Sequence, residues 1–254
     1  MMRAILAVSV LSFTECAAFG QSAAPAFDVA SIKASQIGKA GGEGSRRESV
    51  NSSPGSLTMR NVSLSSCIRW AYNVKPFQVS GPTWLESERY DVLAKAADPA
   101  STDQLRLRLQ ALLADRFRLT LHREEKIMPT YALVVAKNGP KFHQSDGEGK
   151  STINGSKGGV VTVEKTSMTQ LADLLSQPLR CPITDMTGLK GVYDFTVDLT
   201  SYIPAEFKPG DPPPDIVGIA MSALQDQLGL KLEAKKGPVE ILIIDHAEKV
   251  PTET

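Results

Sequence analysis

One segment pattern occurs twice in the chain, and this repeat constrains the fold more than any other feature. Residues 112–136 (LLADRFRLTLHREEKIMPTYALVVA) are similar to residues 224–245 (LQDQLGLKLEAKKGPVEILIID). Each segment runs from a helix end into an alternating strand, through a charged turn with a proline, and into an apolar strand. The matched positions are Leu119 with Leu230, Leu121 with Leu232, and Pro129 with Pro238. Such self-similarity predicts two copies of one structural unit, each ending in a β-hairpin.

The similarity continues upstream of these segments. Tyr90-Asp91 and Tyr193-Asp194 each open a predicted strand. Two amphipathic helices are predicted before them, over residues 63–72 and 167–175, because their apolar residues recur with the helical period. The predicted order of elements in each copy is therefore β-α-β-β-α-β-β. A further, weakly predicted element lies at residues 77–80 in the first copy and 183–185 in the second. If the copies are related, Leu119 and Leu230 should both be buried, and His122 and Glu233 should both face away from the helices.

Serines mark the starts of the predicted helices. Ser63 and Ser167 are natural N-caps, and Gln170 completes a capping box with Ser167. Ser101 and Gln104 form another box at the start of a helix that continues to Leu113. The Leu-Arg-Leu-Arg-Leu run at 105–109 also alternates as a strand would, but the cap favours a helix.

These elements predict an α+β fold of two related units, each with a small, mostly antiparallel sheet and helices packed on one face. The first unit spans residues 21–145, with an N-terminal strand at Phe27–Lys33 and a flexible Gly-rich loop at 38–55. Residues 146–159 are predicted to be a linker. The second unit spans residues 160–254 and contains a Pro-rich loop at 204–214.

The first twenty residues have the pattern of a secretory signal peptide. A positive start at Arg3 precedes an apolar stretch from Ala4 to Phe13, and Ala18-Phe19-Gly20 fits a cleavage site. We therefore expect the chain to be exported to the periplasm or beyond. After cleavage, Cys67 and Cys181 are the cysteines that remain. In an oxidising compartment they could form a disulfide, or they could be two separate thiols.

Composition excludes several classes of function. The chain has 28 Lys and Arg and 28 Asp and Glu, which is not the excess of cations that nucleic-acid binding requires. No apolar run reaches the length needed to span a bilayer, so we expect no stable membrane insertion after signal cleavage.

Residues with catalytic chemistry do not form a recognisable motif. His122, His143 and His246 have no metal-ligand spacing, and the adjacent side chains of Asp245 and His246 should point to opposite faces of a strand. We expect no catalytic, cofactor-binding or metal-binding residues. For two sets of residues the sequence leaves two roles open: a structural role at the surface or in the core, or a role in ligand binding. The first is an arginine cluster interleaved with acids, Arg106, Arg108, Arg116, Arg118 and Arg123; the second is an aromatic group, Trp70, Tyr72 and Trp84.

Several longer motifs resemble an uncharacterised secreted family of Acidobacteria, often called the Solibacter type. They include FDVASIK, SGPTWLESERYDV, LLADRFRLTLHRE, YALVVAKNGPKF and DMTGLKGVYDFTVDL. The resemblance implies a domain of unknown function, whose relatives can be joined to membrane-bound metallopeptidase domains. The order of elements in the second copy also resembles the short N-terminal domain of secretins and TonB-dependent receptors, which engages partner proteins.

Together these observations favour a secreted or periplasmic, non-enzymatic module that binds an envelope protein or peptide. One alternative is an unrecognised hydrolase with a site between the two units. Another is a regulatory partner of an envelope metallopeptidase.

The signal pattern makes a direct prediction about the exported protein. Because cleavage is expected after Gly20, N-terminal sequencing of that protein should begin at or near Gln21. A mature product that still starts at Met1 would contradict the prediction.

Overall fold

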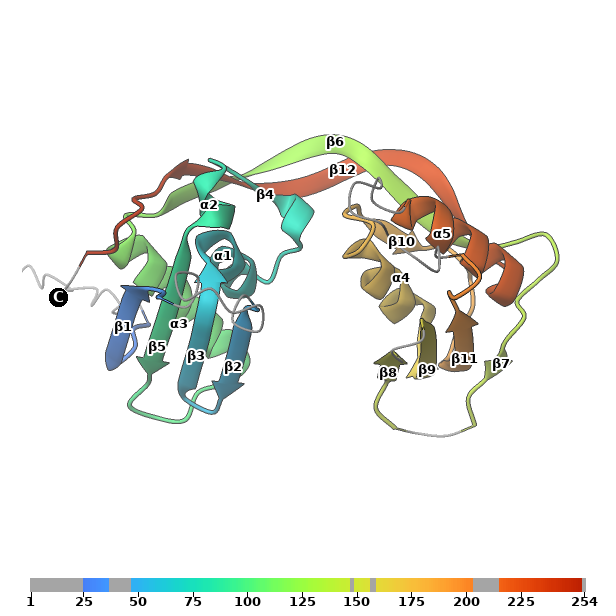
Figure 1. Ribbon diagram of the computed structural model, residues 1–254, viewed down its shortest axis with the longest axis horizontal. Helices are drawn as coiled ribbons and strands as arrows, with labels where there is room; N and C mark the ends of the chain where they lie inside the picture. The colour runs from blue at the N-terminus through green and yellow to red at the C-terminus, as the bar shows by residue number, and fades with distance from the viewer. Residues whose placement is uncertain (1–24, 37–46, 147–148, 156–158, 203–214, 253–254) are drawn as a thin grey trace, which may run out of the picture.

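The protein forms two lobes joined by a long two-stranded ribbon (Figure 1). This computed structural model describes residues 25–36, 47–146, 149–155, 159–202 and 215–252. We use lobe 1 for residues 25–121 and 239–252, and lobe 2 for residues 131–233, within those described ranges. The predicted signal peptide and the predicted Pro-rich loop lie outside the described residues.

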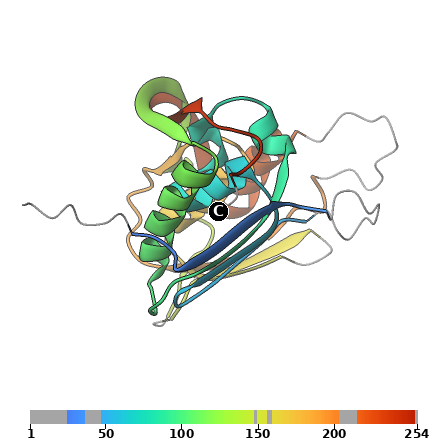
Figure 2. The same cartoon turned by 90° about the vertical axis from the view of Figure 1, so that its left-hand side faces the viewer.

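Lobe 1 is an antiparallel sheet with the strand order β1-β5-β3-β2, and helices α1 and α3 cover one of its faces (Figure 2). Its elements are β1 (Val29–Ala34), β2 (Ser49–Ser53), β3 (Ser56–Ser63), α1 (Leu64–Tyr72), η3 (Pro76–Gln78), β4 (Val79–Ser80), α2 (Trp84–Ser87), β5 (Arg89–Lys95) and α3 (Thr102–Arg116). Alternate residues of β3 and β5, such as Leu57, Met59 and Val92, are fully buried against these helices.

Lobe 2 has a second antiparallel sheet, with the order β7-β11-β9-β8. Its elements are β7 (His143–Gln144), β8 (Thr152–Gly155), β9 (Val160–Thr166), α4 (Met168–Ser176), β10 (Ile183–Asp185), β11 (Tyr193–Asp198), α5 (Ile216–Ala223) and a π-helical turn, η4 (Leu224–Leu228). Small antiparallel sheets with helices on one face make the fold α+β, as the sequence predicts.

The sheets of the two lobes have equivalent strand orders, with β2, β3, β5 and β1 in the places of β8, β9, β11 and β7. They also share one local irregularity. Asn61 and Lys165, near the ends of β3 and β9, both have a positive φ, of 53° and 49°. Their backbone N–H groups donate to the carboxylates of Asp91 (2.7 Å) and Asp194 (2.6 Å). The recurrent Tyr-Asp pair therefore has a shared structural role: its aspartate accepts a hydrogen bond from a strained backbone position just before a helix.

Helix starts agree with the predicted caps. The side chains of Ser63, Ser101 and Ser167 accept hydrogen bonds from backbone N–H groups three residues further on, and the two predicted capping boxes at Ser101 and Ser167 are present. Residues 105–109 are helical, within α3. The cap and the continuation of the apolar stripe therefore predict this segment correctly, although its local alternation also fits a strand.

The two predicted hairpins do not form. Instead, β6 (Thr120–Val135) and β12 (Leu230–His246) are continuous strands that pair antiparallel with each other along their whole length. In this ladder Pro129 lies opposite Lys236, and Pro238 lies opposite Ile127. A proline lacks the donor for a ladder bond and is tolerated where a strand has a free side, which each strand has in the middle of the ribbon (Figure 1).

The two lobes therefore exchange their last strands. Leu119, before β6, is buried in lobe 1, but Leu133 near the end of β6 is fully buried in the core of lobe 2. Conversely, β12 begins with Leu230 in lobe 2 and ends with Leu242 and Ile244 in lobe 1. The short strands β10 and β4 add to β6 and β12 in parallel, at opposite ends of this third sheet.

The boundaries expected from the sequence are changed by these pairings. A division at residues 146–159 separates strands that share a core, because β6 and β12 each enter both lobes. The expected loop at 38–55 contains β2, since Ser49–Ser53 pairs back onto β3 through a turn at Gly55, whose φ is 80°. The expected linker contains β8, which pairs with β9.

The exchange can be tested with a pair of core truncations. Leu242→Ala should remove about 2–5 kcal/mol of stability, as expected for a buried leucine. Hydrogen exchange should show the loss of protection in α1 of lobe 1, although residue 242 belongs to the second repeat in sequence. Leu133→Ala is the matched variant and should expose α4 of lobe 2. Loss of protection in α4 for Leu242→Ala and in α1 for Leu133→Ala would contradict the strand exchange.

Candidate functional site

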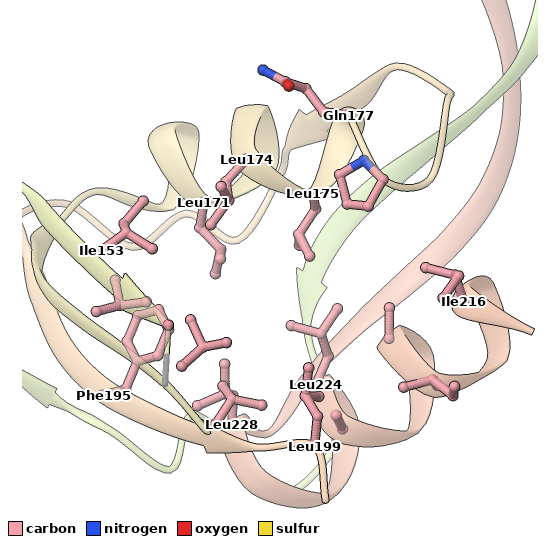
Figure 3. Close-up of a pocket in the computed structure, with 18 residues that line it drawn as sticks. Ile153, Leu171, Leu174, Leu175, Gln177, Phe195, Leu199, Ile216, Leu224 and Leu228 are labelled. Atoms are coloured by element: carbon pink, nitrogen blue, oxygen red, sulfur yellow. The ribbon is translucent and has the colours of Figure 1, made fainter. Parts of the chain in front are cut away.

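The most distinctive hollow of the described structure is a cavity of about 520 Å³ in lobe 2 (Figure 3). It lies between one face of the β8-β9-β11 sheet and the helices α4 and α5. Its lining residues are Ile153, Gly155, Val161, Val163, Leu171, Leu174, Leu175, Gln177, Pro178, Phe195, Val197, Leu199, Ile216, Ile219, Ala220, Ala223, Leu224 and Leu228. A space of this size is within the range of small-molecule sites in proteins.

The sheet wall of the cavity follows from strand periodicity. Ile153 on β8, Val161 and Val163 on β9, and Phe195 and Val197 on β11 lie on the same face, since side chains alternate along each strand. The intervening residues on these strands, such as Thr162, Glu164 and Thr196, face the other side. The period-two pattern therefore gives the cavity a continuous apolar wall.

The helices α4 and α5 lie on either side of the cavity, so the helix layer has a gap between them (Figure 3). From α4, Leu171 and Leu175 point into the space, while Leu224 and Leu228 close it from the side of η4. The residues that α5 contributes include the small Ala220 and Ala223. The short side chains at these two positions leave part of the space between the two helices unfilled, beside the larger Ile216 and Ile219.

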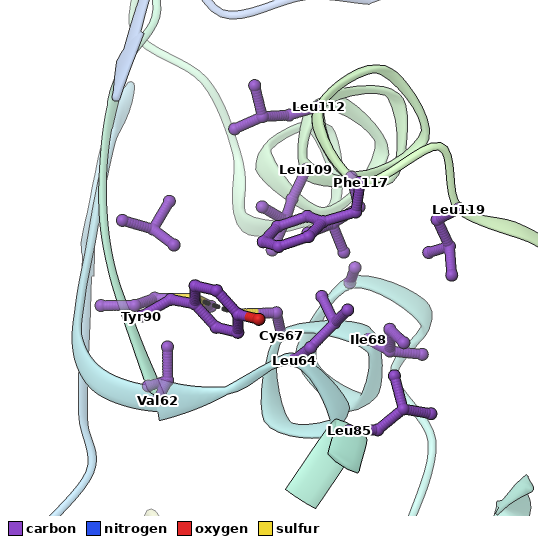
Figure 4. Packing of buried hydrophobic residues seen from close by; sticks show 14 of the residues in the cluster. Val62, Leu64, Cys67, Ile68, Leu85, Tyr90, Leu109, Leu112, Phe117 and Leu119 are labelled. Atoms are coloured by element: carbon purple, nitrogen blue, oxygen red, sulfur yellow. Dashed lines mark hydrogen bonds between the residues drawn. The ribbon is translucent and has the colours of Figure 1, made fainter. Parts of the chain in front are cut away.

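Lobe 1 fills the equivalent space with its own side chains (Figure 4). There α1 and α3 pack directly on each other, and the side-chain amide of Gln110 donates to the carbonyl of Ala71 at 2.8 Å. Leu109 and Leu113 of α3 are fully buried between α1 and the sheet. The same arrangement of strands therefore carries a closed core in one lobe and a cavity in the other.

The cavity lining offers little polar chemistry. Within the described parts of the chain, Gln177 is the one lining residue with a polar side chain, and the amide of that side chain points away from the hollow (Figure 3). None of the lining residues is an acid, a base or a nucleophile. Ligand sites in proteins are mostly lined by such apolar side chains, so the arrangement suits binding by burial of apolar surface.

The histidines are found outside the cavity. His122 and Asp245 face each other across the ribbon, with Nδ1 of the histidine 2.9 Å from Oδ1 of the aspartate. Both side chains are about half exposed, and His246 instead lies 4.0 Å from Glu248. Among the described residues, no group of three or more His, Cys, Asp and Glu could hold a metal ion.

Most of the arginine cluster forms ion pairs at the surface. Arg106 pairs with Asp103, Arg116 with Asp115 and Arg123 with Glu240, which fits the interpretation of a solvated, charge-balanced face. Arg108 and Arg116 border a smaller hollow of about 290 Å³. The Nε atoms of Arg106 and Arg108, and Nη1 of Arg108, are buried without a hydrogen-bond partner.

The aromatic residues of lobe 1 complete its core. Trp70, Tyr72 and Trp84 are partly buried against the main cluster. The guanidinium of Arg106 lies 5.8 Å from the ring centroid of Trp70, and the Lys249 ammonium lies at the same distance from Trp84. These contacts cover the outer faces of the two indoles, so the core interpretation describes this group.

Cys67 and Cys181 are free thiols in the cores of different lobes. Cys67 is buried in α1 beside Met59, with 3.8 Å between their sulfur atoms (Figure 4). Cys181 is half-buried next to β10. The structure thus has the second of the two arrangements left open by the sequence. Burial raises the pKa of both thiols, that of Cys67 to about 12, to which the nearby charge of Glu48 also contributes.

A model of one protein family, described as "Protein of unknown function (DUF3738)", matches residues 65–247. The chain belongs to this family. The matched range begins in α1 and runs through β12. It covers lobe 2, the ribbon and the part of lobe 1 that follows β3. No curated protein and no solved structure matches the chain. No helix within the described ranges of this family member is long and apolar enough to cross a membrane.

The different burial of the two thiols predicts different reactivity. At mildly alkaline pH, a maleimide should label Cys181 in the folded protein and leave Cys67 unmodified, because Cys67 is both inaccessible and protonated. Mass spectrometry of peptides from the labelled protein measures this directly. Labelling of both residues after denaturation without reductant is the control, since a disulfide would prevent it.

Proposed function

We propose that the protein is an exported, non-enzymatic binding module, which holds an apolar part of an envelope protein or peptide in the lobe 2 cavity. The observation that carries this proposal is the cavity itself, about 520 Å³ of space with an apolar lining. Export is supported by the signal pattern in residues 1–20.

The energetics of the cavity favour binding by a partner's apolar groups. Burying one aliphatic or aromatic side chain contributes about 1.5–3 kcal/mol, so a few such groups are enough for specific association. Ile153, Leu174 and Ile216 line the cavity and are also among the exposed large hydrophobic residues of the chain. They extend its apolar surface outward, where a partner can reach it.

The binding role is preferred to the hydrolase alternative because of the chemistry available at the cavity. Hydrolysis requires a positioned acid, base or nucleophile near the substrate, and the lining residues supply none of these. The His122–Asp245 pair is on the ribbon, outside the lining. A regulatory partner of a metallopeptidase would also act by binding, and would use the same apolar contact.

The proposal gives the two lobes different roles. We infer from their equivalent strand orders and their shared Tyr-Asp geometry that they arose by internal duplication. On this view lobe 1 keeps a filled core, while lobe 2 has opened the equivalent space between its helices for a ligand.

The cavity can be tested with an apolar dye and two adjacent substitutions in α5. The neutral dye N-phenyl-1-naphthylamine should bind the wild-type protein with increased fluorescence. Ala223→Leu extends a side chain into the cavity and should weaken dye binding at least about tenfold, since it fills space that the ligand would occupy. Fluorescence titration measures both affinities.

Ser222→Leu is the matched control, because Ser222 is exposed on the same helix and does not line the cavity. It should leave dye binding unchanged. If Ala223→Leu does not fold, Ala220→Leu offers a second site on the cavity wall. Equal dye affinity in the wild type and a folded cavity-filling variant would show that the cavity is not the binding site.

A further inference from the structure

We infer that the ligand of the lobe 2 cavity is a single long aliphatic chain, whose polar head group stays outside. This inference rests on the proposed function, because it specifies what the same cavity binds. Three observations on the described lining residues carry it: none of them directs a hydrogen-bonding side chain into the cavity, the space is large, and its walls are aliphatic.

The interior of the cavity cannot satisfy a polar ligand. Its lining residues are apolar except for Gln177, whose amide points outward. A peptide backbone that entered would bury N–H and C=O groups without partners, and each such group costs several kcal/mol in an apolar environment. A hydrocarbon chain has no such groups and meets no penalty of this kind.

The volume of the cavity matches a chain better than a single side chain. A cavity of about 150 Å³ holds one benzene molecule, with its six carbon atoms. By simple proportion, the 520 Å³ of this cavity corresponds to roughly twenty carbon atoms. One inserted leucine or phenylalanine would leave most of the space empty, and empty apolar volume is unfavourable.

The walls of the cavity are flexible aliphatic side chains rather than flat rings. Most are Leu, Ile, Val or Ala, and Phe195 is the one aromatic residue among the lining residues. A flat polycyclic ligand usually stacks on aromatic side chains, which this lining does not provide. A flexible chain can follow the space between α4, α5 and the sheet.

The lining also determines where the head group lies. No Lys or Arg is among the described residues that line the cavity, so a carboxylate or phosphate inside it would be buried without a counter-charge from them, at high cost. The head group must therefore remain at the mouth, beside the exposed side chains of Ile153, Leu174 and Ile216. The shared chemistry is thus an alkyl chain. On the proposed function this chain belongs to a lipidated envelope protein or peptide, and a membrane lipid or a free fatty acid is the other source that the test separates.

The test is a ladder of saturated fatty acids that displace N-phenyl-1-naphthylamine from the full exported chain. Affinity should rise about fourfold for each added methylene, since burial of one contributes about 0.8 kcal/mol. The rise should continue from octanoic through dodecanoic to hexadecanoic acid and level off when the cavity is full. In Ala223→Leu, or Ala220→Leu, it should level off at a shorter chain, and in Ser222→Leu it should not change.

Head-group variants separate the sources of the chain. Hexadecanoic acid, monopalmitoylglycerol and palmitoyl-triglycine carry the same chain and should all displace the dye, because the head stays outside. A preference for the glycerol ester indicates a membrane lipid, and a preference for the acylated peptide indicates a lipidated protein. Unacylated triglycine should not displace the dye.

Three results would overturn the inference. One is displacement that does not depend on chain length, and another is equally strong displacement by the apolar peptide trileucine amide. The third is dye binding that is lost in Ala223→Leu but is competed by none of the acyl compounds. In that case the cavity would still be a binding site, so the proposed function would stand while the aliphatic ligand would not.

Discussion

The pairing of β6 with β12 is the interaction on which the rest of the structure depends. This ladder is the only sheet that enters both lobes in the described parts of the chain, and it supplies a wall to each core. Without Leu133 the lobe 2 cluster would lose a fully buried member, and without Leu242 and Ile244 the core of lobe 1 would be open on one side. Each lobe is therefore completed by a strand that begins in the other. The ion pair between Lys75 and Asp173 is a further link between them.

Local structure was predictable from local sequence. Ser101 with Gln104 and Ser167 with Gln170 fix helix starts through bonds within four residues, so their effect does not depend on the rest of the fold. The strand exchange was not predictable in this way. A hairpin and an exchanged strand bury the same leucines against the same kind of core, and they differ only in which copy supplies the strand. The segment Arg123–Met128 lacks the Gly or Asn that favours a tight turn, and this is the one sequence signal that points to a continuous strand.

The cavity was also not predictable from the sequence, for a different reason. Val161, Val163, Phe195 and Val197 alternate as core residues do, and nothing in that pattern tells a filled core from a hollow one. Whether this core is filled or hollow depends on the distance between α4 and α5. The helix stripes do not distinguish the two cases either. α3 buries Leu105, Leu109, Leu112 and Leu113, and the matching stripe of the second copy also carries large residues, Val217, Met221, Leu224 and Leu228, packed in or against the lobe 2 core.

The size of that space bears on why it exists. At about 24 cal/mol per Å³, a sealed and empty cavity of this volume would cost on the order of 10 kcal/mol, which is comparable to the whole stability of a typical domain. The opening to solvent at Ile153, Leu174 and Ile216 lowers that cost, but it exposes apolar surface instead. Either way lobe 2 is less stable than a filled lobe of the same architecture. A bound apolar ligand relieves both penalties, and it stabilises the folded state by mass action, by an amount that rises with the logarithm of the ligand concentration over Kd. Because β6 and β12 connect the cores, lobe 1 holds the far end of each strand in place. The filled lobe therefore supports the open one, and this allows a hollow in lobe 2 that an isolated unit of its size would not tolerate.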